Sequence, residues 1–453
     1  SPRVGFTWDV LGDKSLKVRG GSGLFSGRLP LVFFTNMPTN SGMVQNVAAI
    51  STSASGEPHE LLKEFSGKMI TDVNELVAKL NKLDPKKYPL TIKPEDGVAP
   101  SSIQAVDPTF RMPQVWKSSI AVDYAFPTSF PFSVTGEFTF NKTINGVMLQ
   151  DWNLKDPSGF SRFTGVDNRH IYPENYTYTS TSAYVLTNTN KGYGHTSNIS
   201  VNIKPMDRLS VIASYTHTVQ KEVSGMPGSN AESAFTYLPT IEGPNYCGVH
   251  NSQYVTPDRA FVSLNYEDKG NNHYSIFYEA WRGGANESYM YTQDLNGDGY
   301  AYDLIYIPNN ASEVKWASPE DAKNFFAFVE QDKYLSTHKG QYAEAYSVYS
   351  PWTHRVDLRY AHDFVVMAGG KKNILQFNID FKNVLNIFNP AWGVAKYMNS
   401  SINEGRILSI KEIDNSGAPV FKSNVDGNTP TWTPSSGVGQ CWYFQVGIRY
   451  KFN

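Results

Sequence analysis

The feature of this sequence that most constrains its fold is a series of segments in which apolar and polar side chains alternate. In the last segment, CWYFQVGIRYKFN, one side of an extended chain carries Trp442, Phe444, Val446, Ile448, Tyr450 and Phe452. Gln445, Arg449 and Lys451 fall on the other side. A length of about ten residues and a period of two are typical of a tilted strand that crosses a membrane. We therefore expect the six apolar and aromatic side chains to face lipid.

The same pattern recurs along the whole chain. Eleven segments show it, near residues 3–10, 15–25, 113–126, 131–144, 194–204, 208–218, 255–267, 272–282, 353–364, 373–385 and 440–452. In THRVDLRYAHDF, one side carries two arginines and two aspartates, which excludes a packed apolar interior on that side. A water-filled lumen suits such a side. The expected lumen-wall residues are Glu137, Glu279, Arg355, Asp357, Arg359 and Asp363, either paired with other charges in the wall or in contact with a ligand.

The connections between these segments are alternately short and long. The short ones are LGDKS, FPTSF, KPMDRL, EDKGNN and MAGGKKN; the long ones cover about 27–112, 145–193, 219–253, 283–352 and 386–439. This alternation is typical of outer-membrane barrels, which have short periplasmic turns and long extracellular loops. The sequence therefore predicts an all-β, antiparallel transmembrane barrel, with a soluble β-sandwich as the alternative.

Composition agrees with a barrel and excludes other classes. Charged residues make up 18% of the chain, against roughly 25% in soluble domains, and aromatic residues reach 14%. The formal net charge of -2 gives no basic surface for nucleic acid. No apolar run is long enough for a membrane helix. We also find no G-x-S-x-G elbow and no His spacing for catalysis, so we expect no enzyme.

An odd number of strands has a further implication, because bacterial single-chain barrels are even-numbered and closed. We expect residues 1–453 to form the C-terminal part of one barrel domain, with the remaining strands lying elsewhere. The opening residues, SPRVGFTWDV, fit this expectation because they resemble a strand and not a signal peptide.

The first long connection contains a segment with helical spacing. Its apolar residues are Leu61, Leu62, Phe65, Met69, Val73, Leu76, Val77 and Leu80. One helix, or two broken near Gly67, is expected at the rim.

One motif has the spacing of a metal-binding loop. QDLNGDGYAYD places Asp294, Asn296 and Asp298 at alternate positions, followed by the carbonyl of Tyr300 and by Asp303. Calcium takes six to eight oxygen ligands, and the D-x-N-x-D-G spacing lets these side chains converge. The EF-hand glutamate is missing, since Ile305 stands at that position. The alternatives are a calcium loop that stiffens an external connection and a Gly- and Asp-rich turn without metal.

For two groups of residues in the connections, the sequence leaves two alternative roles. Aromatic residues could contact a sugar or peptide ligand or lie in the interfacial girdles; these are Trp281, Tyr289, Tyr291, Trp316, Trp352, Trp392 and Trp432. Cys247 and Cys441 are either paired or free thiols.

Several stretches together resemble the Oar-like branch of TonB-dependent outer-membrane receptors of Bacteroidetes and other Gram-negative bacteria. They are SPRVGFTWDV with LKVRGGSGLFSGRLP, TNTNKGYGHTSNISVNI, QDLNGDGYAYDLIYIP, and HRVDLRYAHDF with LQFNIDFKNVLNIFNPAWG. Members of that family have an N-terminal plug inside a 22-stranded barrel. The resemblance implies about 11 of 22 strands in this chain. It also implies a receptor that binds a ligand at the cell surface and admits it to the periplasm.

The resemblance also implies partners: the plug and the remaining barrel strands of the same receptor, the TonB complex, outer-membrane lipids and surface lipoproteins. An alternative function is a barrel that serves as an adhesion or protein-complex platform without transport. The ligand is not readable from the sequence, because long loops vary most in what they contact.

Overall fold

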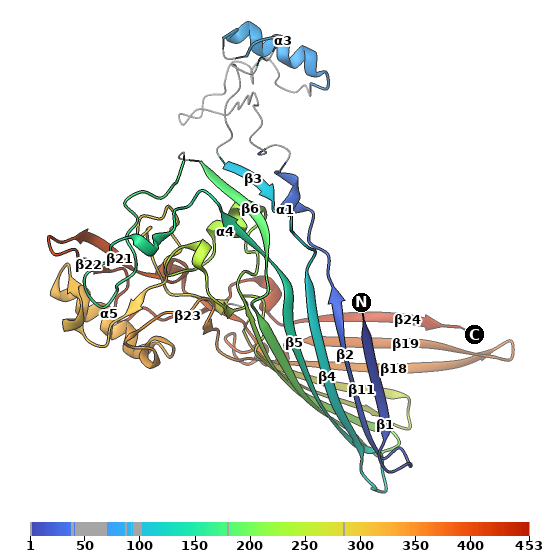
Figure 1. Cartoon of the computed structure of the whole chain (residues 1–453). Coiled ribbons are helices and arrows are strands. Elements are labelled where there is room, and N and C mark those ends of the chain that lie inside the picture. Colours follow the sequence, from blue (N-terminus) through green and yellow to red (C-terminus); the bar gives the residue numbers. More distant parts are fainter. Residues whose placement is uncertain are drawn as a thin grey trace.

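The computed structural model describes residues 2–37, 40, 70–86, 88–91, 93, 102–178, 181–283 and 286–452. Figure 1 shows a strongly curved sheet that carries a folded body at one end of its strands. The strands follow one another in the sheet in the order β1 (Arg3–Asp9), β2 (Leu16–Ser26), β4 (Gln114–Ala125), β5 (Phe132–Asp151), β7 (Tyr193–Met206), β8 (Leu209–Glu222), β10 (Asp258–Glu267), β11 (Asn272–Arg282), β18 (Thr353–Ala368), β19 (Lys371–Lys382) and β24 (Tyr443–Lys451). All ten pairings along this path are antiparallel.

Each of the eleven expected segments overlaps one strand of this path, so the prediction of an antiparallel β structure is confirmed. Some strands extend beyond their expected limits. β5 continues to Asp151, where its last residues pair with β6 (Ser182–Thr189), a strand that the sequence did not predict. The sheet is open, because β1 and β24 are the two ends of the path and do not pair with each other.

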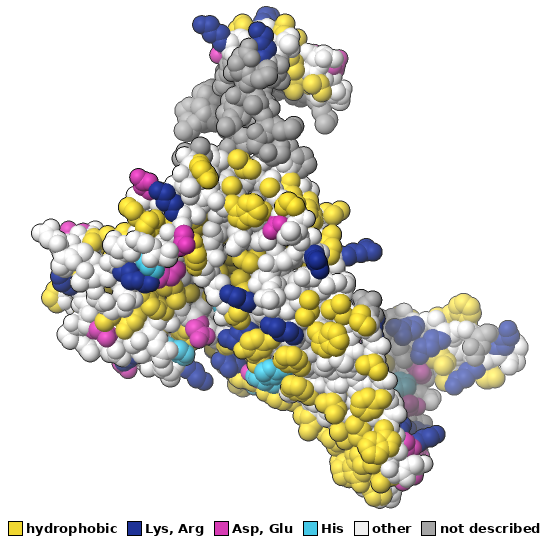
Figure 2. Space-filling model, viewed as in Figure 1, with side chains coloured by type: hydrophobic (Ala, Val, Ile, Leu, Met, Phe, Trp, Pro, Cys, Tyr) yellow, Lys and Arg dark blue, Asp and Glu magenta, His cyan; other side chains and the backbone are white. Residues whose placement is uncertain are grey.

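The strand register places apolar side chains on one face of the sheet and polar or charged side chains on the other, across neighbouring strands. Ile379 lies opposite Val446 and Phe377 opposite Ile448, whereas Asp380 lies opposite Gln445. We call the face that carries Val446 the apolar face and the face that carries Asp380 the polar face. Exposed members of the apolar face are Phe6, Ile120, Phe138, Ile199, Val262, Ile276, Phe364 and Leu375. Figure 2 shows hydrophobic side chains gathered over the lower part of this sheet.

Short turns connect the strands at the end of the sheet that lies away from the folded body. Their residues favour the backbone conformations of tight turns. Gly369 and Gly370 join β18 to β19 with φ values of 60° and 77°, and positive φ at both central positions is what a type I′ hairpin turn requires. Between β10 and β11, the Asp268 carboxylate accepts hydrogen bonds from the backbone N–H groups of Gly270 (2.7 Å) and Asn272 (3.0 Å).

The long connections carry the remaining secondary structure. Their helices and 3-10 turns are α1 (Val32–Thr35), α3 (Val73–Leu83), η2 (Pro157–Gly159), α4 (Ala231–Thr236), η3 (Pro244–Tyr246), η4 (Ala311–Glu313), α5 (Pro319–Gln331), η5 (Leu335–Thr337), η6 (Val384–Ile387), η7 (Ser400–Gly405) and η8 (Val438–Gln440). Their short strands are β3 (Ser102–Val106), β9 (His250–Asn251), β12 (Asn286–Glu287), β13 (Met290–Tyr291), β14 (Tyr306–Ile307), β15 (Lys315–Trp316), β16 (Gln341–Tyr342), β17 (Val348–Tyr349), β20 (Lys396–Met398), β21 (Arg406–Ile413), β22 (Pro419–Ser423) and β23 (Trp432–Pro434).

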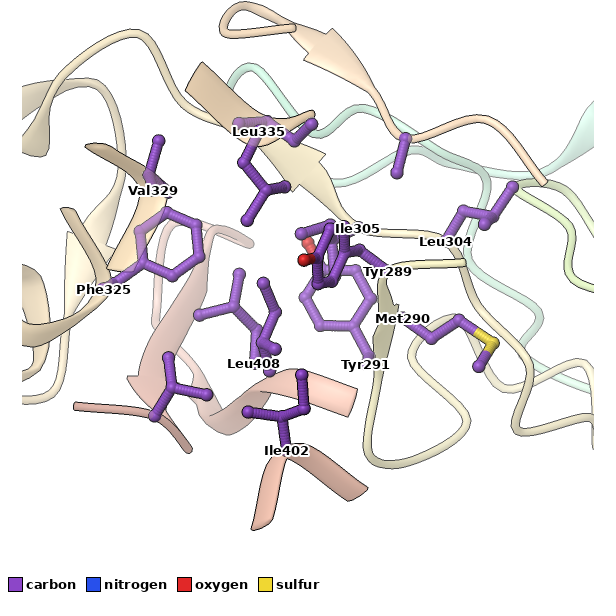
Figure 3. Packing of buried hydrophobic residues seen from close by; sticks show 14 of the residues in the cluster. Tyr289, Met290, Tyr291, Leu304, Ile305, Phe325, Val329, Leu335, Ile402 and Leu408 are labelled. Carbon is purple, nitrogen blue, oxygen red and sulfur yellow. The ribbon is translucent and has the colours of Figure 1, made fainter. Parts of the chain in front are cut away.

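Residues 146–178, 181–192, 223–257, 286–352 and 383–442 fold together, and we call them the loop body. Its larger hydrophobic cluster joins separate connections, because Tyr289, Phe328 and Ile407 are all fully buried in it. Figure 3 shows this packing around Tyr289, Ile305 and Leu408. A second cluster includes Leu149, Leu186 and Phe235. The loop body is therefore a packed structure with its own core.

Local signals determine the two longer helices. The Ser318 side chain caps α5 by accepting a hydrogen bond from the Asp321 N–H at 3.2 Å, and Pro319 begins the helix. In α3, Leu76 and Leu80 pack on Tyr88, which confirms the later part of the expected helical segment. Leu61, Leu62, Phe65, Gly67 and Met69 lie outside the described residues. None of the described helices combines the length and the apolar character needed to cross a membrane.

Candidate functional site

The six expected lumen-wall residues all lie on the polar face, which follows from the strand register. Four of them, Glu137, Glu279, Asp357 and Arg359, pair with charged residues on other strands of the sheet. Glu137 lies 3.0 Å from Arg19, which also lies 3.0 Å from Asp123. Arg259 donates to Glu279 at 2.8 Å. These contacts agree with pairing inside the wall, although the partners come from outside the expected set.

The charged residues of β18 are held in the same way. Asp357 lies 2.8 Å from Lys382, and Arg359 lies 3.1 Å from Asp380. Asp363 accepts a hydrogen bond from Gln376 at 2.7 Å. Each of these contacts joins β18 to β19.

Arg355 differs from the rest because it contacts the base of the loop body. Its Nη2 donates to Oε1 of Gln440 (3.0 Å) and to the carbonyl of Gly393 (3.3 Å). Its guanidinium also lies 5.4 Å from the centre of the Trp281 ring. Arg355 therefore connects the polar face to the last long connection.

The segment from Asp294 to Asp303 forms a tight loop inside the loop body. The Asp294 carboxylate accepts hydrogen bonds from the backbone N–H groups of Gly297 and Gly299, each at 2.8 Å. Both glycines have positive φ, 82° and 93°, a conformation that other residues rarely adopt. The chain therefore reverses sharply at these two glycines.

Asn296 and Asp298 project into the interior, with exposed fractions of 1% and 0%. Asp298 Oδ1 accepts a hydrogen bond from the Tyr300 N–H at 2.8 Å. The other oxygen, Oδ2, is buried without a hydrogen-bond partner, and so is the Asn296 amide nitrogen. Burial, together with the negative charges of Asp303 and Asp294, raises the pKa of Asp298 well above the ordinary carboxyl range.

The two carboxylate oxygens of Asp303 have different partners, one in the loop and one on a buried arginine. Its Oδ2 accepts a hydrogen bond from the Leu295 N–H (2.7 Å), and its Oδ1 lies 3.2 Å from Nη1 of Arg169. Arg169 is fully buried and also bonds both oxygens of Asp167, at 2.9 and 3.1 Å. Burial raises the pKa of Asp303, and the Arg169 charge opposes that rise.

Arg169 and Asp167 were not among the residues that the sequence singled out. They lie in an irregular connection, where neither hydrophobic period nor motif marks a buried position. Asp167 also accepts hydrogen bonds from the hydroxyls of Tyr291 (2.8 Å) and Tyr342 (3.1 Å). The tyrosines around this ion pair become apparent only when two long connections, 145–193 and 283–352, are packed together.

The side chain of Tyr300, whose carbonyl was the expected ligand, points into the second cluster. Its hydroxyl donates to Asp151 Oδ2 at 2.8 Å. Within the described part of the chain, no three His, Cys, Asp or Glu side chains are grouped so as to hold a metal on their own. A cation at this loop would therefore need amide and backbone oxygens besides carboxylates.

The aromatic residues of the connections do not form one exposed platform. Tyr289 and Tyr291 are fully buried, because their rings fill the larger cluster and their hydroxyls bond Asp332 and Asp167. Neither ring is exposed, so these two tyrosines take neither of the two roles left open for them, ligand contact or an interfacial girdle. Trp352 and Trp392 are exposed by 40% and 51% and remain available at the surface.

The two cysteines are both free. Cys247 lies in the loop body, where its Sγ is 3.3 Å from the carbonyl oxygen of Val223. Burial raises the pKa of the Cys247 thiol to about 12. Cys441 is exposed just before β24.

Comparison with known proteins decides the family. Residues 1–412 match the family described as outer membrane beta barrel domain. The chain belongs to this family. It is therefore an outer-membrane β-barrel protein, which agrees with the antiparallel sheet and its two contrasting faces. No curated protein matches the chain significantly.

Among solved structures, the outer membrane transporter YddB from Escherichia coli is similar to this outer-membrane barrel protein. The identity is 8% and the TM-score is 0.42. The match covers 98% of this chain and 40% of the transporter chain, so the chain spans less than half of its length.

Proposed function

We propose that this chain supplies wall strands and external loops to a TonB-dependent receptor, which binds a ligand at the cell surface and admits it to the periplasm. The observation that carries the proposal is the combination of an open sheet with a packed loop body at one end. Among the residues that the structure describes, β1 and β24 each pair on one edge only, and free edges in a membrane must be paired. The remaining strands of the same receptor are the partners that would complete the barrel.

The two faces of the sheet support this arrangement. The apolar face, including Trp442, Phe444, Val446, Ile448, Tyr450 and Phe452, would contact outer-membrane lipid. The polar face would line a lumen that a plug fills, with its charges already paired by neighbours such as Arg19 and Asp380. The loop body would lie outside the cell, because barrels of this kind have short periplasmic turns and long external loops.

Uptake measurements in cells test the transport proposal. Strains lacking either this receptor or TonB should lose uptake of the same compounds from the medium, whereas cells with both intact should deplete them. The compounds that the receptor-deficient strain no longer takes up should therefore also be ones that the TonB-deficient strain no longer takes up. If the receptor-deficient strain loses only surface attachment, and the TonB-deficient strain does not, the chain serves as an adhesion or complex platform and the transport proposal is wrong.

A further inference from the structure

Aromatic and basic side chains share one row on the apolar face, close to the loop body. Lys142 of β5 lies opposite Trp116 of β4 and Tyr193 of β7. Tyr193 in turn lies opposite Lys221 of β8, so the two lysines flank it. Trp116 and Tyr193 are exposed by 40% and 43%. Because tryptophan and tyrosine collect at the interface between a membrane and water, this row marks the level of the lipid headgroups.

Lys221 also lines a cavity between the strands and the loop body, which we call the rim cavity. Its volume is about 480 Å³, within the range of roughly 300–1,000 Å³ that is usual for small-ligand sites. Val219 and Lys221 of β8 and Arg282 of β11 line it from the sheet. Lys333 and Tyr349 line it from the loop body. The register places the three strand residues on the apolar face, so the rim cavity lies beside that face.

The three basic side chains of the rim cavity carry charge that the protein does not fully neutralise. Within the described part of the chain, neither Lys221 nor Lys333 has an ion-pair partner. The Arg282 guanidinium lies 3.9 Å from Oδ2 of Asp258 and 5.1 Å from the centre of the Tyr349 ring. Both contacts are longer than a hydrogen bond, so they hold the guanidinium beside the cavity without occupying its N–H groups.

Two acidic residues also line the rim cavity, and both accept hydrogen bonds from the protein. Asp332 is buried and accepts hydrogen bonds from the hydroxyls of Tyr289 (2.7 Å) and Thr431 (2.8 Å). Glu344 accepts a hydrogen bond from the Ser347 hydroxyl at 3.1 Å. Three basic side chains line the cavity with these two carboxylates, so the lining has a net positive charge and attracts an anion.

A lipid phosphate is the anion that suits this lining. An arginine side chain bonds two phosphate oxygens at once, and lysine adds a compact positive charge. Val219 and the apolar face beside the cavity would contact hydrocarbon chains, which free phosphate lacks. Basic side chains at the level of the headgroups are the groups by which membrane proteins bind anionic lipids.

We propose that the rim cavity binds a phosphate group of an outer-leaflet lipid through Arg282, Lys221 and Lys333, with the acyl chains of that lipid on the apolar face. The inference rests on the orientation proposed above, with the loop body outside the cell, and does not depend on transport. A bound lipid would join the strands to the loop body, because Lys333 and Tyr349 belong to the loop body. It would thereby fix the loop body against the membrane surface.

The test uses the intact receptor in detergent, titrated with lipid A that carries two phosphates and followed by native mass spectrometry. We expect saturable binding of one lipid per chain. Lipid A from which the phosphates have been removed should bind more weakly by about tenfold or more, because it cannot make the charge-assisted contacts. Inorganic phosphate at the same concentration should not displace the lipid, since it gains nothing from the apolar face.

Matched variants separate the rim cavity from a general attraction to lipid. Lys221→Gln combined with Arg282→Gln should weaken the binding of phosphorylated lipid A by about tenfold or more. Lys323→Gln removes an exposed cation of the loop body, 3.4 Å from Glu320, and should leave the binding unchanged. An unchanged unfolding midpoint without lipid shows that the double variant folds. If that midpoint falls, Lys333→Gln takes its place, with the same expected loss of binding.

Equal binding by the natural protein and the cavity variants would overturn the proposal, and so would equal binding of lipid A with and without its phosphates. Displacement of the lipid by inorganic phosphate would overturn it too, because the cavity would then be a site for the free anion. These results are separate from the uptake measurements. A receptor that fails the transport test should still bind the lipid, and a loss of phosphate dependence here would leave the transport proposal untouched.

Discussion

Nη1 of Arg169 lies 3.2 Å from Oδ1 of Asp303, a contact that joins two connections far apart in the chain. Replacing Arg169 by Met would keep the volume of the side chain but leave Asp167 and Asp303 buried without their cation. We expect Arg169→Met to destabilise the loop body by about 3–5 kcal/mol. Urea unfolding followed by Trp316 fluorescence measures this change.

Arg162 provides the matched control for this substitution. Its side chain is 45% exposed and pairs with Glu242 at 3.1 Å. Because water screens exposed pairs, Arg162→Met should cost less than about 1 kcal/mol. Similar losses for the two variants would show that Arg169 does not hold the connections together.

The packing of α5 gives a second prediction. Phe328 is fully buried, and its ring packs edge-on against Tyr289 with centroids 6.3 Å apart. Phe328→Ala should cost about 3–5 kcal/mol, because the cavity cannot be filled by the surrounding connections. Lys323→Ala, on the exposed side of the same helix, should change stability by less than about 0.5 kcal/mol. Hydrogen exchange should be faster throughout the loop body of the first variant but unchanged in the middle of β7 and β8.

Neighbouring residues of β24 test the assignment of the two faces. Val446 is on the apolar face and Gln445 is on the polar face. Val446→Lys should reduce the free energy of folding into lipid vesicles by about 2–4 kcal/mol if the residue lies near the bilayer centre. Gln445→Lys should have little effect, since its side chain would meet water and lie opposite Asp380. A larger loss for the second variant would reverse the assignment of the faces.

The two thiols should react very differently with a maleimide. At pH 8 the thiolate form of Cys247 is scarce because burial raises its pKa to about 12. Cys441 is exposed and should be labelled quickly. Mass spectrometry of the folded protein should therefore show one label, at Cys441, and two labels after denaturation. Rapid labelling of Cys247 in the folded protein would contradict its buried position.

The raised pKa of the Cys247 thiol also affects stability at high pH. Because the Cys247 pKa is higher in the folded protein than in the unfolded chain, ionisation favours unfolding. The free energy of unfolding should be unaffected by this group below about pH 8 and should fall as the pH rises above about 8.5. Cys247→Ala should lack this component of the pH dependence, which denaturant titrations at pH 7 and pH 10 would measure.

The strands could be predicted because their pattern is local. Alternation of Val356, Leu358 and Tyr360 with charged residues reflects the two faces of one strand and needs no knowledge of the neighbours. The loop body could not be predicted in this way. Its strands are often two residues long, as in β13, and pair with strands more than one hundred residues away, as β13 does with β21.

The loop from Asp294 to Asp303 has one feature that the sequence predicts and others that it does not. The spacing of Asp294, Asn296 and Asp298 was readable, because it lies within one short segment. The unpartnered oxygen of Asp298 beside Gly243 depends on packing between connections, and so does the role of Arg169. The roles of Tyr289 and Tyr291 stayed open for the same reason, since an aromatic residue in a long loop gives no local sign of whether it is exposed.

The shared core of the long connections limits how the outer end of this protein can move. Tyr289, Phe328 and Ile407 come from different parts of the chain yet fill one cluster. A displacement of any one connection exposes apolar surface belonging to the others, so separate loop movements are penalised. A force on one connection would therefore act on the whole loop body, which would move as one unit and not as separate loops.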